Sequence, residues 1–169
     1  IKHIIPDYIK SLDHPIKGKT IGLPKEFFND DLNHEVKIVL EQVIDSYQKM
    51  GVNFKEISLA NSHLSIPVYY VIAPAEASSN LSRYDGVKFG YRAKEFKDLE
   101  EMYLKTREQG FGEEVKRRIL VGTYVLSAGY YDAYYLKAQK IRRLIADDFK
   151  NAFKECDLIL APSCPSTAF

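Results

Sequence analysis

Two short apolar segments flank an amphipathic segment in the first third of the chain. Residues 19–24 and 52–59 are rich in apolar and β-branched side chains, which is typical of buried strands. From Val36 onward, apolar residues recur with the 3.6-residue period of a helix, between a suitable N-cap at Asn33 and a suitable C-terminal stop at Gly51. Strand, helix and strand in this order predict a βαβ unit with parallel strands.

Helical patterns dominate the rest of the chain. We expect Asn61 or Ser62 to cap the first of these helices, and Pro74 to kink it or to remove one of its hydrogen bonds. Asp98 is a suitable cap for the second. The predicted helices cover residues 63–82, 99–107 and 113–126. Residues 130–135 lead into a last long helix that ends near Glu155, and a third buried strand covers residues 158–162.

The helix predicted over residues 113–126 carries the most informative pattern. Four residues at helical spacing form one apolar face: Val115, Ile119, Gly122 and Leu126. A glycine inside a helix costs about 1 kcal/mol relative to alanine, so Gly122 indicates the close approach of another backbone. Arg118 lies beside this face, in line with Gly122, and a cation there needs a partner.

Two interpretations of Arg118 remain open from the pattern alone. Its guanidinium either pairs with an internal Asp or Glu and has a structural role, or it faces a crevice and binds a carboxylate with two parallel hydrogen bonds. The segment around Pro74 offers similar alternatives. Tyr69 or Tyr70 presents its hydroxyl to a ligand pocket, or both tyrosines and the polar pair Glu76 and Asn80 belong to a packed helix.

Together these elements predict an α/β fold, with a mixed β-sheet of a few strands covered by long helices. The 169 residues correspond to one domain, with hydrophobic and charged contents of 46% and 28% that are ordinary for a globular protein. The chain has no initiator methionine and stops in mid-flow, so we expect residues 1–169 to be a single partial domain of a larger protein. No apolar run reaches the roughly 20 residues that cross a bilayer, and no signal peptide is visible.

Charge and residue spacing exclude several kinds of site. The net charge of +1 gives no global field for nucleic acid, although the basic strip 137–143 is either a solvated helix face or a docking strip for RNA phosphates. Cys156 and Cys164 lack metal-ligand spacing and are expected to be reduced thiols of a cytosolic protein. The four histidines are scattered, and neither a nucleophile elbow nor a phosphate-binding loop is present.

Residues 69–86 and 110–140 closely resemble the A subunits of bacterial aspartyl/glutamyl-tRNA amidotransferases, within the amidase signature family. The resemblance extends to residues 19–24 and 161–169 and covers nearly the whole chain, and the run 110–135 is specific to these subunits among amidases. It implies the C-terminal part of the amidase signature fold. The family's catalytic Lys and two Ser belong to an upstream signature region that nothing here matches, so no catalytic residue is assigned to this chain.

The resemblance implies that this chain contributes to a glutamine pocket. Arg118 stands at the position of the family's substrate arginine, which is expected to hold the α-carboxylate of glutamine. Tyr69 stands at the position of its substrate tyrosine and is expected to line the same pocket. A further acidic contact to the α-amino group would lie beyond Phe169.

The resemblance also implies partners and cofactors. Ammonia released from glutamine would pass to a partner in a heterotrimer with subunits B and C, where ATP and Mg²⁺ support amidation of misacylated Glu-tRNA(Gln) or Asp-tRNA(Asn). No cofactor or metal is expected in this chain, no membrane is involved, and the isolated chain is expected to be inactive. The alternatives are a stand-alone amidase of the same superfamily and a non-catalytic interaction module.

Overall fold

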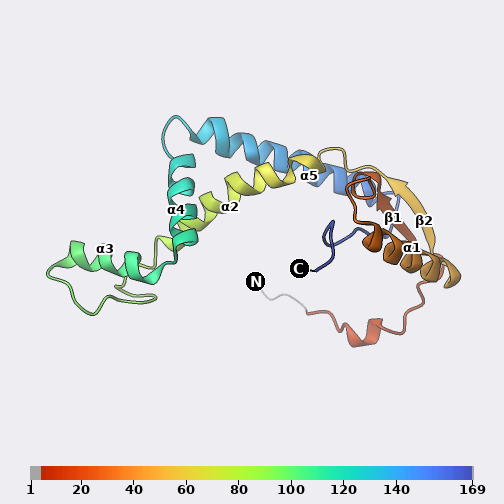
Figure 1. The fold of residues 1–169 in the computed structure, drawn as a ribbon, viewed down its shortest axis with the longest axis horizontal. Coiled ribbons are helices and arrows are strands. Elements are labelled where there is room, and N and C mark those ends of the chain that lie inside the picture. The colour runs from red at the N-terminus through yellow and green to blue at the C-terminus, as the bar shows by residue number, and fades with distance from the viewer. Residues whose placement is uncertain (1–4, 169) are drawn as a thin grey trace. The chain divides into compact units, whose positions relative to one another are not determined.

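A computed structural model describes residues 5–168 of the chain, which form two compact units (Figure 1). The first, here called the sheet unit, comprises residues 5–62 and 147–168. The second, here called the helical unit, comprises residues 63–146. The chain therefore leaves the sheet unit once and returns to it once.

The sheet unit contains three parallel strands in the order β2-β1-β3. They are β1 (Thr20–Pro24), β2 (Asn53–Ile57) and β3 (Leu158–Ile159), with Ile21 of β1 paired to both Phe54 and Leu158. Helix α1 (His34–Lys49) connects β1 to β2, and the Asn33 side chain caps it by accepting from the backbone N–H of Glu35. The predicted βαβ unit, its parallel pairing and its N-cap are confirmed.

The core of the sheet unit is small. Its cluster of buried residues in mutual contact is Ile57, Leu59, Ala152 and Cys156, with Phe27 and Ile159 packed against them. Helix α1 buries none of its residues completely, and Val39 on its apolar side is 57% exposed. The amphipathic pattern thus predicted the helix, but among the described residues its apolar face is only partly covered.

In the described part of the sheet unit, three carboxylates accept from backbone N–H groups that lie more than 30 positions away. Asp157 accepts from Thr20 N and from Lys19 Nζ, both at 2.9 Å. Glu26 accepts from Leu59 N at 3.0 Å and from the Ser58 hydroxyl at 2.6 Å. Asp148 accepts from the backbone and the side chain of Asn61. Such bonds satisfy donors that strands and helices leave open at their ends.

The helical unit is built on α2 (Ser65–Leu81) and α4 (Glu113–Val125), which pack against each other (Figure 1). A Cβ atom built on Gly122 would lie only 2.0 Å from the carbonyl oxygen of Pro74. The two helix backbones therefore approach as closely as the pattern predicted. Beside this contact, Ser78 Oγ and Thr123 Oγ1 share a 2.8 Å hydrogen bond.

The remaining helices are α3 (Leu99–Gly110) and α5 (Lys137–Ala152), which begins in the helical unit and ends in the sheet unit. The Asp98 side chain caps α3 by accepting from Glu101 N, as predicted. The start of α5 and α2 form an apolar cluster of Val68, Ile72 and Ala138 with Val71, Ile141 and Ile145.

The predicted cap of α2 is wrong. The N-cap of α2 is Leu64, without a side-chain cap, because Ser62–Leu64 forms a 3₁₀ turn. The side chain of Asn61 binds Asp148 instead. The segment that leads into the long last helix is itself helical: Tyr131–Leu136 forms a π-helical turn that continues without a break into α5. Three apolar residues of the predicted helical segments are exposed: Leu99, Tyr134 and Phe149.

Candidate functional site around Arg118

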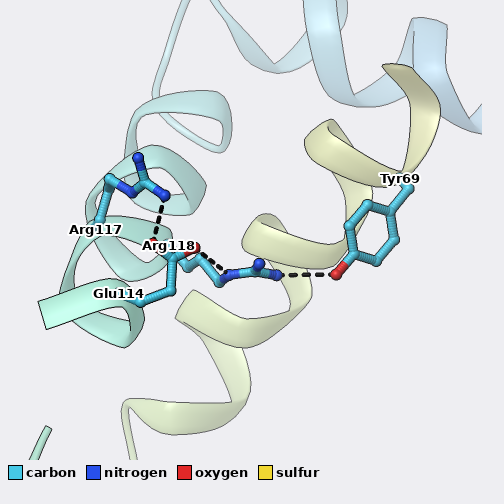
Figure 2. A network of polar contacts seen from close by, with 4 residues as sticks. All are labelled: Tyr69, Glu114, Arg117 and Arg118. Carbon is cyan, nitrogen blue, oxygen red and sulfur yellow. Dashed lines mark hydrogen bonds and ion pairs between the residues drawn. The ribbon is translucent and has the colours of Figure 1, made fainter. Parts of the chain in front are cut away.

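The guanidinium of Arg118 lies between helices α4 and α2 (Figure 2). Its Nε donates to Glu114 Oε1 at 2.9 Å, one turn earlier in the same helix. Its Nη1 donates to the hydroxyl of Tyr69 on α2, also at 2.9 Å. The side chain of Arg118 is 36% exposed, so solvent and small solutes can reach it.

The fold explains why Tyr69 and Arg118 meet although they are 49 positions apart. Arg118 lies one helical turn before Gly122, and Tyr69 precedes Pro74 by five positions on the facing helix. The backbone contact between Gly122 and Pro74 brings these two turns within side-chain reach. The structure thus joins the two residues that the sequence singled out.

The Tyr69 hydroxyl keeps a hydrogen to donate, because it acts as an acceptor toward Arg118. The guanidinium carbon lies 6.0 Å from the centre of the Tyr69 ring, and Tyr70 packs edge-on against that ring, with centroids 5.3 Å apart. Tyr69 therefore contacts Arg118 on one side and Tyr70 on another. Its hydroxyl and the guanidinium lie together and keep hydrogens that can be donated to a ligand.

Glu114 connects two arginines (Figure 2). Its Oε1 accepts from Arg118, and its Oε2 accepts from Nη2 of Arg117. The hydrogen bond from Arg118, followed by that from Arg117, lowers the pKa of the Glu114 carboxyl. The bond to Tyr69, followed by that to Glu114, raises the pKa of Arg118. Two arginine side chains beside one carboxylate leave a local excess of positive charge.

A cavity of about 330 Å³ lies beside this cluster. Tyr70, Pro74 and Val121 give it apolar walls, and Arg117, Arg118 and Glu114 give it charged ones. Small-molecule sites commonly combine a largely apolar lining with a few fixed polar groups and have volumes of a few hundred Å³. Arg118 therefore pairs with a partly exposed carboxylate of its own helix and also lines a cavity.

Neither the role of Glu114 nor the contribution of Arg117 was predicted from the sequence. The spacing of Glu114 and Arg118, i and i+4 with the acidic residue first, is favourable for an ion pair on a helix and was the available signal. Tyr69 was expected to line the pocket. Its neighbour Tyr70 lines the cavity, while Tyr69 reaches the cluster through its hydroxyl.

The other sequence candidates lie outside this cluster. Glu76 accepts from the Tyr135 hydroxyl at 2.8 Å, a bond that raises the pKa of Tyr135. The backbone carbonyl of Asn80 accepts from Nε of Arg83. Cys156 is buried, Cys164 is exposed, and both are free thiols.

Two further features are absent from the described part of the chain. No group of three or more His, Cys, Asp or Glu within residues 5–168 is arranged to hold a metal ion. None of the helices in that range combines the length and the apolar character needed to traverse a bilayer.

Comparison with known proteins gives the chain its family. The amidase family model matches residues 2–169. The chain belongs to the amidase family. Its α/β architecture agrees with this, as does the crystal structure of an amidase, which matches with a TM-score of 0.65 at 19% identity and covers 92% of this chain and 30% of that chain.

Curated relatives are more specific. The chain is 64% identical over 165 residues to the A subunit of the glutamyl-tRNA(Gln) amidotransferase of Dechloromonas aromatica, covering 98% of this chain and 34% of the relative. It is 62% identical over 162 residues to the protein of the same name from Neisseria gonorrhoeae, covering 96% and 34%. This amidase-family chain therefore spans about a third of the length of these relatives.

A solved structure supports the same relationship. The crystal structure of the glutamyl-tRNA(Gln) amidotransferase A subunit from Thermotoga maritima matches with a TM-score of 0.62 and 34% identity, covering 94% of this chain and 30% of that chain. The resemblance to A subunits stated from the sequence is confirmed, and so is the fold class.

Proposed function

We propose that this chain forms part of the glutaminase subunit of a tRNA-dependent amidotransferase and supplies part of the pocket for glutamine. The observation that carries the proposal is the hydrogen bond between Arg118 and Tyr69 beside the cavity. Both residues stand at the positions of the family's substrate arginine and tyrosine, and the fold brings them together.

The geometry supports a specific binding mode for the α-carboxylate of glutamine. The Nε edge of Arg118 is engaged by Glu114, so the carboxylate would accept from the two Nη groups at the other end. The hydroxyl of Tyr69 would donate its remaining hydrogen to the same carboxylate. The side-chain amide of glutamine would then extend toward a nucleophile supplied by another part of the full-length protein.

The remaining steps belong to other parts of the assembly. In this proposal the released ammonia reaches a partner within a heterotrimer containing subunits B and C. That partner uses ATP and Mg²⁺ to amidate misacylated Glu-tRNA(Gln) or Asp-tRNA(Asn) and makes most of the tRNA contacts. Residues 1–169 alone are proposed to lack glutaminase activity, because the Lys and two Ser of the family's mechanism are not assigned to this chain.

The test is an Arg118→Ala variant of a full-length subunit that contains this chain, assayed as the assembled enzyme. We expect kcat/KM for glutamine to fall. The fall corresponds to a loss of about 2–4 kcal/mol in transition-state stabilisation, as expected when a charged group that binds the substrate is removed. Lys116→Ala is the matched control, because Lys116 pairs with exposed Glu113 and does not line the cavity. Unchanged glutamine kinetics in Arg118→Ala would refute the pocket assignment.

Hydrolysis of varied amides by a full-length subunit without tRNA or partners would instead favour a stand-alone amidase. Detectable turnover by purified residues 1–169 would place the active centre within this chain and contradict the proposed division of labour.

A further inference from the structure

Arginine side chains are flexible, so an arginine that binds a planar anion well must first be oriented. Free rotation about its side-chain bonds is lost on binding and reduces affinity. In this chain two contacts restrict Arg118: Glu114 at Nε and the Tyr69 hydroxyl at Nη1. The hydrogen bonds of Arg118 to described residues use these two nitrogens, and Nη2 makes none of them.

We propose that Glu114 is a positioning residue, which fixes the guanidinium of Arg118 so that its Nη edge receives the substrate carboxylate. This inference rests on the proposed function of Arg118. Glu114 acts through Arg118 and also draws Arg117 to the wall of the same cavity. It needs no contact with the substrate.

A purely structural role explains Glu114 poorly. Its side chain is 51% exposed, and its partners are three and four residues further along the same helix. Such pairs on an exposed helix face stabilise a helix only weakly. Helix α4 also has Glu113 in its first turn, which serves the helix dipole equally well.

Charge alone and positioning predict opposite effects on glutamine binding when Glu114 is neutralised. Glu114 is an anion beside a site proposed to bind an anion, so its removal would raise the local positive charge. If charge alone mattered, neutralising Glu114 would strengthen glutamine binding. If positioning matters, the same change weakens it, because the guanidinium loses its fixed orientation.

The experiment measures glutamine-dependent activity and glutamine binding by calorimetry for Glu114→Ala and Glu114→Gln in the assembled enzyme. We expect KM and Kd for glutamine to rise about tenfold in Glu114→Ala, with a smaller change in kcat. We expect a smaller rise in Glu114→Gln, whose amide oxygen still accepts from Arg118. Glu113→Ala is the control, because Glu113 is 91% exposed and pairs with Lys116.

A substrate analogue separates positioning from folding. With the α-carboxamide of glutamine, which lacks the carboxylate, Glu114→Ala should bind as weakly as the parent enzyme does. A general loss of structure would weaken the binding of both ligands. Thermal unfolding of each variant measures such a loss directly. A KM and Kd for glutamine that stay unchanged or fall in Glu114→Ala, while Arg118→Ala is impaired, would overturn the positioning role alone. No effect of Arg118→Ala would overturn the proposed function itself.

Discussion

Three carboxylates of the sheet unit differ from Glu114 of the helical unit in what they hold. In the sheet unit Glu26, Asp148 and Asp157 each accept from a backbone N–H of a distant segment. In the helical unit Glu114 accepts from two arginine side chains of its own helix. The first arrangement holds backbone together, and the second orients side chains next to a cavity.

This difference helps to separate architecture from function. A part-buried backbone N–H needs a hydrogen-bond partner, so the bonds from Leu59 N to Glu26 and from Asn61 N to Asp148 are explained by folding. A partly exposed arginine has no such requirement, because water solvates it. Folding does not require the cluster of Glu114, Arg118 and Tyr69, so a functional role is the simplest explanation for it. Packing in the helical unit comes instead from the contact of α2 with α4.

The largest expected effect concerns that contact. Gly122→Ala should lower the free energy of unfolding by about 3 kcal/mol, at the upper end for overpacking, because the new methyl group would lie 2.0 Å from the Pro74 carbonyl oxygen. Urea unfolding followed by circular dichroism measures this loss.

Gly110→Ala is the matched control for that measurement. An added Cβ at Gly110 meets the Tyr91 ring at an ordinary distance of 3.5 Å, so we expect a change of less than about 1 kcal/mol. Equal effects of the two substitutions would mean that α2 and α4 are not held by close backbone approach.

A smaller effect is expected for a carboxylate of the sheet unit. Asp148 Oδ2 accepts from Asn61 N at 2.8 Å, and both carboxylate oxygens accept from Asn61 Nδ2 at 3.1 Å. Asp148→Ala should lower the free energy of unfolding by about 2 kcal/mol, because it leaves a part-buried backbone N–H without its partner. Glu114→Ala, measured in parallel, should lower it by less than about 0.5 kcal/mol. Similar losses in both variants would remove the distinction between the two units.

The smallest effect depends on pH. Burial raises the pKa of Glu26, but hydrogen bonds from Leu59 N and the Ser58 hydroxyl outweigh it, and the pKa lies below its ordinary value of 4.5. A lowered folded-state pKa contributes stability above the unfolded-state pKa, and this contribution is lost as the pH falls through the folded value. Glu26→Gln should therefore lower the free energy of unfolding by about 1 kcal/mol at pH 7. The difference from the parent chain should shrink as the pH falls below 4.5. A difference that stays constant down to pH 3 would contradict the role of the ionised carboxylate.

Much of the fold could be predicted because its signals are local. The period of α1, the caps Asn33 and Asp98, and the order of strand, helix and strand all lie within a few residues of one another. Gly122 allowed one long-range prediction, because a glycine inside a helix indicates the close approach of another backbone.

Other features needed coordinates because their partners are distant in sequence. The local sequence predicted Asn61 as a helix cap. In the structure its side chain instead donates to Asp148, which lies 87 positions away. The π-helical turn Tyr131–Leu136 carries no period that separates it from an α-helix over so short a stretch. At the candidate site, the sequence and its resemblance singled out Arg118 and Tyr69. Their direct hydrogen bond, and the part played by Glu114, follow only from how α2 packs on α4.

The bond between Asn61 and Asp148 has an evolutionary consequence. The chain passes into residues 63–146 just after Asn61 and comes back just before Asp148, so the two crossing points are tied side by side. An insertion whose ends start from one spot can be lengthened, shortened or exchanged between genes without disturbing the strand order of its host. A lineage could therefore reshape the cavity-lining helices α2 and α4 while inheriting the parallel sheet unaltered.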